Sequence, residues 1–150
     1  MKQLKRSVLL WYSAREMYDL VTGVEDYPRF LPWCDRAEVL VRHDDGITAR
    51  LGLAYAGVRH AFTTRNENRP DEVVTMRLVD GPFSSLEGVW AFRPIEAAPA
   101  DRQACRVELD LRYAFSSRPL EALLSPVFDK VAETLVDSFV SRAESVYGPR

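Results

Sequence analysis

The side chains that could carry out chemistry are few and widely separated in this sequence. The two cysteines are Cys34 and Cys105, and the two histidines are His43 and His60. They do not stand at the short spacing that zinc sites use. We also find no nucleophile paired with a base and no catalytic pair of carboxylates. The sequence therefore predicts no catalytic residue, no metal site and no cofactor.

Each of these polar residues has an ordinary structural explanation. Cys34 follows an apolar loop, which is typical of a buried structural thiol, and we expect both cysteines to be free in a reducing compartment. His60 lies within a predicted strand, where a surface or cross-strand role is expected, and His43 belongs to a predicted hairpin turn. Asp80 ends a predicted strand and is expected to shape the turn that follows.

Large aromatic side chains are the second group with functional potential. They are numerous for one small domain: Tyr27, Phe30, Trp33, Phe83, Trp90, Phe92, Phe115, Phe128 and Phe139. They can form an ordinary core, or they can line a cavity for an apolar ligand. Tight binding of an apolar ligand needs no catalytic group, because each buried CH₂ contributes about 0.8 kcal/mol.

The segment from Tyr27 to Cys34 combines two prolines with several large apolar residues. Prolines prevent a regular strand or a long helix, so we expect a loop with few backbone conformations. Such a loop either plugs one end of the core or forms a gate over a ligand cavity. In both cases we expect Phe30, Leu31 and Trp33 to face inward, toward the C-terminal helix.

A long helix is predicted from about Leu120 to Tyr147. Its apolar residues recur every three or four positions: Leu124, Phe128, Val131, Leu135, Phe139, Ala143 and Val146. Ser116 or Ser117 is the expected N-cap, and Gly148 the expected stop. Pro126 either kinks this helix or ends one helix and starts another with Ser125 as its N-cap. We favour the kink.

The rest of the chain predicts strands and one short helix. A first strand ends near Trp11, and a capping box formed by Ser13 and Glu16 begins a helix that stops at Gly23. The later predicted strands are Ala37 to Arg42, Ile47 to Ala56, Val58 to Asn66, Val73 to Asp80, Leu86 to Phe92 and Ala104 to Phe115. About seven strands with short connections predict an antiparallel sheet and an α+β fold, with the long helix packed on the sheet.

Length and composition narrow the classes of protein further. The 150 residues suit one domain, spanning residues 1–150, and the net charge of −2 gives no global attraction to nucleic acid. The first apolar run is too short for a signal peptide, and no run reaches the length of a transmembrane segment. We therefore expect a cytoplasmic protein.

Several phrases of the sequence resemble one family, the coenzyme Q-binding and ribosome-association toxin (RatA) family of START-like, helix-grip domains. The matching segments span nearly the whole chain: 27–34, 62–66, 79–83, 88–92, 139–143 and 147–148. The resemblance implies a curved sheet wrapped around the long helix, with an apolar cavity between them. Trp33 before Cys34 resembles the quinone-binding branch of the family. The sequence segments around Arg65 and Phe83 resemble the toxin branch as much as the quinone-binding branch. Pro126 interrupts a helix that is continuous in relatives.

The resemblance implies two roles. The first is non-enzymatic binding of ubiquinone or another apolar lipid in support of respiration, with transient contact to a membrane surface. We expect the ligand to contact Tyr27, Phe30, Leu31, Trp33, Phe83, Trp90, Phe92, Phe128, Val131 and Leu135. The alternative is a toxin that binds the large ribosomal subunit and blocks subunit association. It needs arginines that contact phosphate, and the candidates are Arg50, Arg59, Arg65 and Arg93. START-like folds also include cyclases and hydrolases, so fold analogy alone keeps an enzyme as a third alternative.

Overall fold

The computed structural model describes residues 1–96 and 98–150, and within them it contains seven strands and two α-helices. In chain order the elements are β1 (Lys2–Leu10), α1 (Ala14–Thr22), the 3₁₀ helix η1 (Val24–Arg29), β2 (Cys34–His43), β3 (Gly46–Tyr55), β4 (Val58–Arg69), β5 (Val73–Asp80), β6 (Phe83–Pro94), β7 (Cys105–Phe115) and α2 (Arg118–Tyr147). The predicted α+β layout, with a short helix after the first strand and a long helix at the end, is confirmed. Two strands begin three residues earlier than predicted: β2 begins at Cys34 rather than at Ala37, and β6 begins at Phe83 rather than at Leu86.

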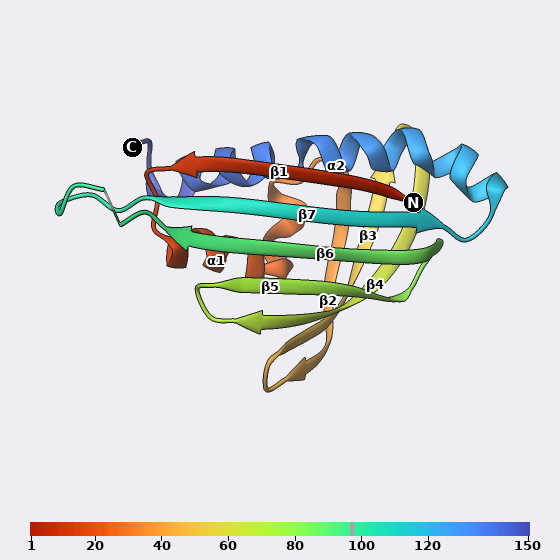
Figure 1. The fold of residues 1–150 in the computed structure, drawn as a ribbon. Helices are drawn as coiled ribbons and strands as arrows, with labels where there is room; N and C mark the ends of the chain where they lie inside the picture. Colours follow the sequence, from red (N-terminus) through yellow and green to blue (C-terminus); the bar gives the residue numbers. More distant parts are fainter. Residues whose placement is uncertain (97) are drawn as a thin grey trace.

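One antiparallel sheet contains all seven strands in the order β1-β7-β6-β5-β4-β3-β2. Figure 1 shows β1, β7, β6 and β5 running alongside α2, whereas β2, β3 and β4 turn away and cross behind it. The sheet is therefore strongly curved, and its concave face wraps around the long helix. This arrangement is the helix-grip fold that the sequence predicted.

The two faces of β7 show why the sheet binds the helix. Val107, Leu109, Leu111 and Tyr113 alternate with polar residues and are all buried. The ring of Tyr113 lies 4.7 Å from that of Phe128 on α2, so this face points toward the helix. The predicted orientation of β7, apolar toward the helix and charged toward water, is confirmed.

Helix α2 begins and ends as predicted and is continuous through Pro126. The Ser117 hydroxyl accepts a hydrogen bond from the Leu120 N–H at 3.3 Å, and Gly148 ends the helix with a φ of 87°. The alternative in which the helix stops and restarts at Ser125 is therefore wrong. Burial of the neighbouring Val127 and Phe128 offsets the hydrogen bond that a proline cannot donate.

The predicted apolar stripe of α2 is buried from Leu124 to Ala143 apart from Leu135, which is half-buried. Val146, predicted on the same stripe, is instead 48% exposed. Tyr147, one helical turn after the fully buried Ala143, takes the inward position and contacts Tyr12, with 6.0 Å between the rings. The stripe therefore ends one residue later than the sequence pattern indicated.

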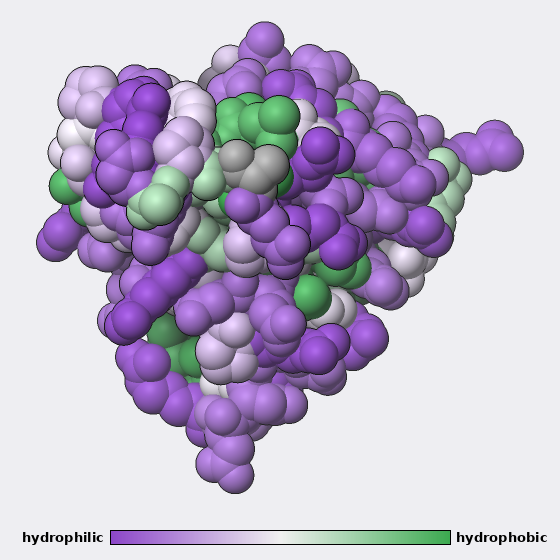
Figure 2. Space-filling model, turned by 60° about the vertical axis from the view of Figure 1, so that its left-hand side comes forward, coloured by the Kyte–Doolittle hydropathy of each residue, from purple (hydrophilic) through white to green (hydrophobic). Residues whose placement is uncertain are grey.

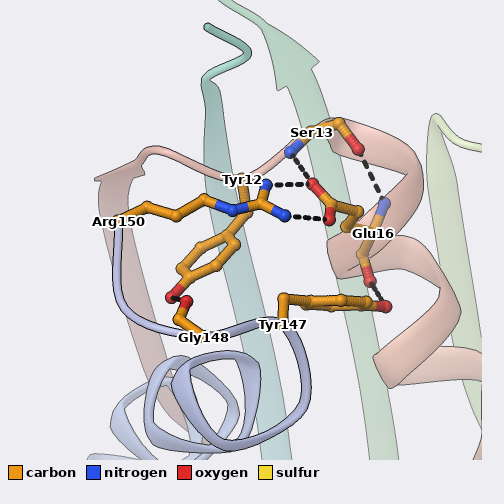
Figure 3. Close-up of polar contacts among 6 residues, drawn as sticks. All are labelled: Tyr12, Ser13, Glu16, Tyr147, Gly148 and Arg150. Carbon is orange, nitrogen blue, oxygen red and sulfur yellow. Dashed lines mark hydrogen bonds and ion pairs between the residues drawn. The ribbon is translucent and has the colours of Figure 1, made fainter.

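The C-terminal residues bind the start of α1 (Figure 3). The guanidinium of Arg150 donates two hydrogen bonds, of 2.7 and 2.9 Å, to the carboxylate of Glu16. The same carboxylate accepts the Ser13 N–H at 2.9 Å and completes the predicted capping box. The hydroxyl of Tyr12 donates to the Gly148 carbonyl at 2.7 Å, and that of Tyr147 donates to the Glu16 carbonyl at 2.9 Å. These contacts join the two helices at one end of the sheet.

Apolar residues are gathered inside the molecule rather than on the face shown in Figure 2. On that face hydrophobic residues form small, separate areas among hydrophilic ones. The most exposed hydrophobic residues after Met1 lie on different elements: Leu9 on β1, Val79 on β5 and Leu123 on α2. Within the described part of the chain, no helix combines the length and hydropathy that crossing a bilayer requires.

Candidate ligand-binding cavity

An apolar cavity of about 60 Å³ lies between α2 and the concave face of the sheet. Helix α2 supplies Phe128, Val131, Leu135 and Phe139, and the segment from η1 to the start of β2 supplies Val24, Tyr27 and Trp33. The sheet supplies the remaining walls, among them Ala49, Leu51, Phe62, Thr64, Asn66, Gly88 and Trp90. Charged side chains are absent from this lining, so the cavity suits an uncharged, largely apolar molecule.

Two residues on the sheet side of the cavity have little or no side chain. Ala49 lines it from β3 and Gly88 from β6. A Cβ atom at Gly88 would lie 2.6 Å from the terminal methyl of Met76 and 3.3 Å from Leu111. Gly88 therefore lets Met76 and Leu111 pack closely against β6, and a side chain there would collide with Met76.

Six of the ten residues predicted to contact a ligand lie together around this cavity. They are Tyr27, Trp33, Trp90, Phe128, Val131 and Leu135. Five of them come from the two segments that the sequence singled out, the loop after α1 and the apolar stripe of α2. Contact between these residues and a ligand remains a prediction.

The other four predicted residues, Phe30, Leu31, Phe83 and Phe92, lie outside the cavity lining. Leu31 is 1% exposed and belongs to the core. The ring of Phe83 stacks on that of Phe115 at 5.2 Å, and the ring of Phe92 meets that of Tyr18 edge-on at 5.8 Å. Other side chains cover the apolar surface of these residues. Core packing and ligand binding use the same residue types, so the sequence does not distinguish these residues from those that line the cavity.

Phe30 occupies an intermediate place. Its ring is half-buried and meets Phe139 edge-on at 5.2 Å, with the Arg142 guanidinium 5.1 Å from the ring centre. Phe30 therefore faces α2 as predicted, but at the surface of the packing rather than at the cavity wall.

Backbone hydrogen bonds hold the segment from Tyr27 to Cys34 against the sheet. The Leu31 N–H donates to the Tyr27 carbonyl at 2.9 Å, and the Cys34 N–H donates to the Leu31 carbonyl at 3.0 Å. The Ala54 N–H of β3 donates to the Trp33 carbonyl at 2.7 Å. With Leu31 and Trp33 buried, the segment is part of the core, as the plug interpretation expects, and Trp33 also borders the cavity.

Two buried polar side chains on β4 were missed by the sequence analysis. Thr64 and Asn66 line the cavity, and the Thr64 hydroxyl donates to the Asn66 side-chain oxygen at 2.8 Å. Both residues are about 95% buried. Strand alternation could have found them, because Phe62, Thr64 and Asn66 must share one face and Phe62 is the residue expected inside.

Burial keeps the titratable groups near the cavity uncharged. It raises the pKa of the Tyr27 phenol well above its ordinary value, and the phenol donates its hydrogen bond to the Val21 carbonyl. Burial also raises the pKa of the Cys34 thiol to about 11, and Cys105, the second free cysteine, behaves in the same way. At neutral pH neither thiol is a nucleophile, as predicted for structural cysteines.

A second feature lies on the convex face of the sheet. Arg36, Arg50 and Arg59 surround a hollow of about 230 Å³ over β2, β3 and β4. The other two predicted arginines lie elsewhere and have acidic partners: Arg65 pairs with Asp45 at 2.5 Å, and Arg93 pairs with Glu108. Arg50 and Arg59 make no ion pair with another described residue, so they are the better candidates for phosphate contacts.

Comparison with known proteins agrees with this architecture. Residues 10–140 match the family described as polyketide cyclase / dehydrase and lipid transport. The ribosome association toxin RatA of Vibrio cholerae is 40% identical over 148 residues, which cover 99% of both chains. The mitochondrial coenzyme Q-binding protein COQ10 homolog B of Xenopus laevis is 30% identical over 97% of this chain and 59% of its own length.

The fold also has solved relatives. The Zhui aromatase/cyclase from Streptomyces sp. R1128 superposes with a TM-score of 0.76 over 95% of this chain and 93% of its own, at 16% identity. At that identity the likeness concerns the fold alone. The match over residues 10–140 shows that the chain belongs to the polyketide cyclase, dehydrase and lipid-transport family, and the chain is similar to the RatA toxins and to a COQ10 protein.

Proposed function

We propose that this protein binds an apolar small molecule, an isoprenoid quinone or a related lipid, in the cavity between α2 and the sheet, without catalysing a reaction on it. The observation that carries the proposal is an uncharged cavity walled by Tyr27, Trp33, Trp90 and Phe128 in a sheet that grips a helix. The COQ10 relative, named as a coenzyme Q-binding protein, supports a quinone as the ligand class. The non-catalytic role is supported by the raised pKa values of Tyr27 and Cys34, which leave both groups protonated.

The size of the cavity limits how such a ligand enters. A buried water needs roughly 10–15 Å³, so about 60 Å³ accommodates a small ring or a short stretch of chain. A longer tail must therefore extend past the lining or displace it. Leu51, Met76 and Leu135 line the cavity and are only half-buried, which makes them the side chains that a tail would displace.

The test is extraction of purified protein with organic solvent, followed by mass spectrometry of the extract. Protein made in a quinone-producing host is expected to release quinone or a related lipid. Val131→Phe, which fills the cavity from α2, should abolish this recovery, whereas Leu123→Phe on the exposed side of the same helix should not. Recovery of no apolar molecule from the wild-type protein would contradict the proposal.

Association with the large ribosomal subunit is the second candidate function. It is supported by the RatA relatives, which cover almost the whole chain, and by Arg50 and Arg59 on the convex face. In a sucrose gradient at low salt the protein should migrate with the large subunit and dissociate as salt rises, because phosphate contacts release counterions.

Matched variants make this second test specific. Replacing Arg50 and Arg59 by Ala should weaken co-migration and reduce its salt dependence. Replacing Arg29 and Arg69, which are exposed and lie outside the hollow, changes the net charge equally and should have little effect. Absence of co-migration by the wild-type protein at low salt would exclude this candidate.

A further inference from the structure

We infer that the cavity selects ligands carrying an uncharged hydrogen-bond acceptor, such as a quinone or ketone carbonyl, which accepts a hydrogen bond from the indole N–H of Trp33. This inference rests on the proposed function and adds to it a chemical criterion for the ligand. A purely hydrocarbon molecule of the same shape would not meet this criterion.

The indole nitrogen of Trp33 is a buried donor without a hydrogen-bond partner among the described residues. Trp33 is 5% exposed and lines the cavity. Buried donors in folded proteins are almost always paired, because an unpaired one has lost its water without gaining a replacement. An acceptor on a bound ligand would remove this cost, and a hydrocarbon would leave it in place.

Two hydrogen bonds hold the peptide unit that joins Trp33 to Cys34. The Trp33 carbonyl accepts the Ala54 N–H, and the next residue, Cys34, donates its N–H to Leu31. The backbone that carries the indole is therefore already ordered before a ligand binds. Pre-organisation of this kind lowers the entropic cost of forming the new hydrogen bond.

Thr64 and Asn66 provide the second polar position on the cavity wall. They bond to each other at 2.8 Å, and both are buried. A side-chain amide offers two donor hydrogens and an acceptor oxygen, so the single bond to Thr64 leaves capacity for a ligand group. The cavity thus combines apolar walls with polar groups contributed by the loop before β2 and by β4.

The absence of charged side chains from the lining restricts the ligand further. An ionised headgroup would lose its hydration inside the cavity without gaining a counter-charge there. A neutral carbonyl loses much less, and Trp33 offers it a hydrogen bond. Neutral quinones and ketones fit these conditions better than fatty acids or phosphorylated lipids.

Menadione and methylnaphthalene form a suitable pair of probes, because both are fused two-ring molecules and only the quinone carries carbonyl oxygens. Their affinities for the full-length protein are measured by isothermal titration calorimetry. The wild-type protein should bind the quinone more tightly. Trp33→Phe, which keeps an aromatic ring but removes the N–H, should lower the quinone affinity about tenfold and leave the hydrocarbon affinity nearly unchanged.

Two further variants control for folding and for position. Trp11→Phe makes the same substitution at a residue 39% exposed and outside the cavity, so it should change neither affinity. If Trp33→Phe does not fold, Thr64→Val combined with Asn66→Leu removes the second polar position without leaving either partner unpaired. That double variant should also weaken the quinone selectively.

The outcomes separate this inference from the proposed function. If both probes bind the wild-type protein equally and Trp33→Phe changes neither affinity, the cavity binds apolar molecules but the acceptor criterion is wrong. If neither probe binds, the proposed function fails and the inference fails with it. Selective loss of quinone affinity in Trp33→Phe supports both.

Discussion

The space between α2 and the sheet has two regions that differ in packing although both are rich in aromatic residues. In the first region, which we call the aromatic end, Phe83, Tyr113, Phe115 and Phe128 pack against one another with ring separations from 4.7 to 6.3 Å. In the second, the cavity, Trp33 and Trp90 line a space of about 60 Å³ together with aliphatic, aromatic and a few small or polar side chains. Phe128 borders both regions.

The comparison shows that aromatic content does not mark a ligand site by itself. Large rings fill space completely when they meet other rings edge-on or stacked, as at the aromatic end. Space remains at the cavity, where Ala49 and Thr64 line the wall beside the rings.

Phe83→Ala should have the largest effect on stability. It removes a 5% exposed ring that contacts three other rings, and such truncations cost about 3–5 kcal/mol. Denaturant unfolding measures the loss. Phe30→Ala removes the same ring from a half-buried position and should cost clearly less. Equal losses in the two variants would show that the aromatic end is not packed more tightly than its surroundings.

Two substitutions on neighbouring turns of α2 compare the packing beside the cavity with the packing outside it. Val127 and Val131 are both buried, but only Val131 lines the cavity. Val127→Phe should destabilise the protein by about 1–3 kcal/mol, because the added ring has no space. Val131→Phe should cost less than about 1 kcal/mol, because the ring enters the cavity. Thermal melts that reverse this order would contradict the position of the cavity.

Alkaline pH should weaken the fold through the two buried thiols. Their pKa values of about 11 exceed the ordinary value of 9.0, so the folded state binds the proton more tightly than the unfolded chain. The stability they contribute is complete below pH 9.0 and falls between pH 9.0 and about 11. The expected slope is at most about 1.4 kcal/mol per pH unit for each thiol.

Single cysteine variants show how much each thiol contributes to this pH dependence, one beside the cavity and one away from it. Cys105 is 0% exposed and lies on β7, opposite Leu10, away from the cavity, whereas Cys34 directly follows the cavity residue Trp33. Cys105→Ala should remove the full contribution of one buried thiol to the alkaline slope. If water enters the cavity, Cys34 titrates nearer its ordinary pKa, and Cys34→Ala flattens the slope less. Denaturant unfolding at a series of pH values distinguishes these results.

Glu16→Gln should have the smallest effect, because it acts outside both regions. Burial acts to raise the pKa of Glu16, but hydrogen bonds from Arg150 and Ser13 outweigh it and hold the pKa below its ordinary value. The contact therefore stabilises the fold above the ordinary value of 4.5 and is lost as pH falls below it. The variant should lose about 1 kcal/mol at neutral pH, with ligand recovery unchanged. Loss of ligand would connect this contact to the cavity.

Local patterns predicted most of the fold because they depend on neighbouring residues. The capping box of Ser13 and Glu16, the stop at Gly148 and the alternation of β7 each involve residues close in sequence. The strand count followed from turns between such patterns. The sequence patterns were wrong where a contact between distant residues decides the structure. Val146 was predicted to face inward but is exposed, because Tyr147 faces inward instead and packs against Tyr12.

Residue types and spacing indicated which elements form, that the long helix needs an apolar surface, and that Trp33, Phe128 and Val131 belong between helix and sheet. The position of the unfilled space among them could be found only from the folded chain, because a cavity is a mismatch between side chains from β3, β4, β6 and α2 that meet only on folding. The same reason explains why the sequence misplaced Phe83 and Thr64 relative to the cavity. The first was predicted at the ligand site and packs against Phe115, whereas the second was overlooked and borders the cavity.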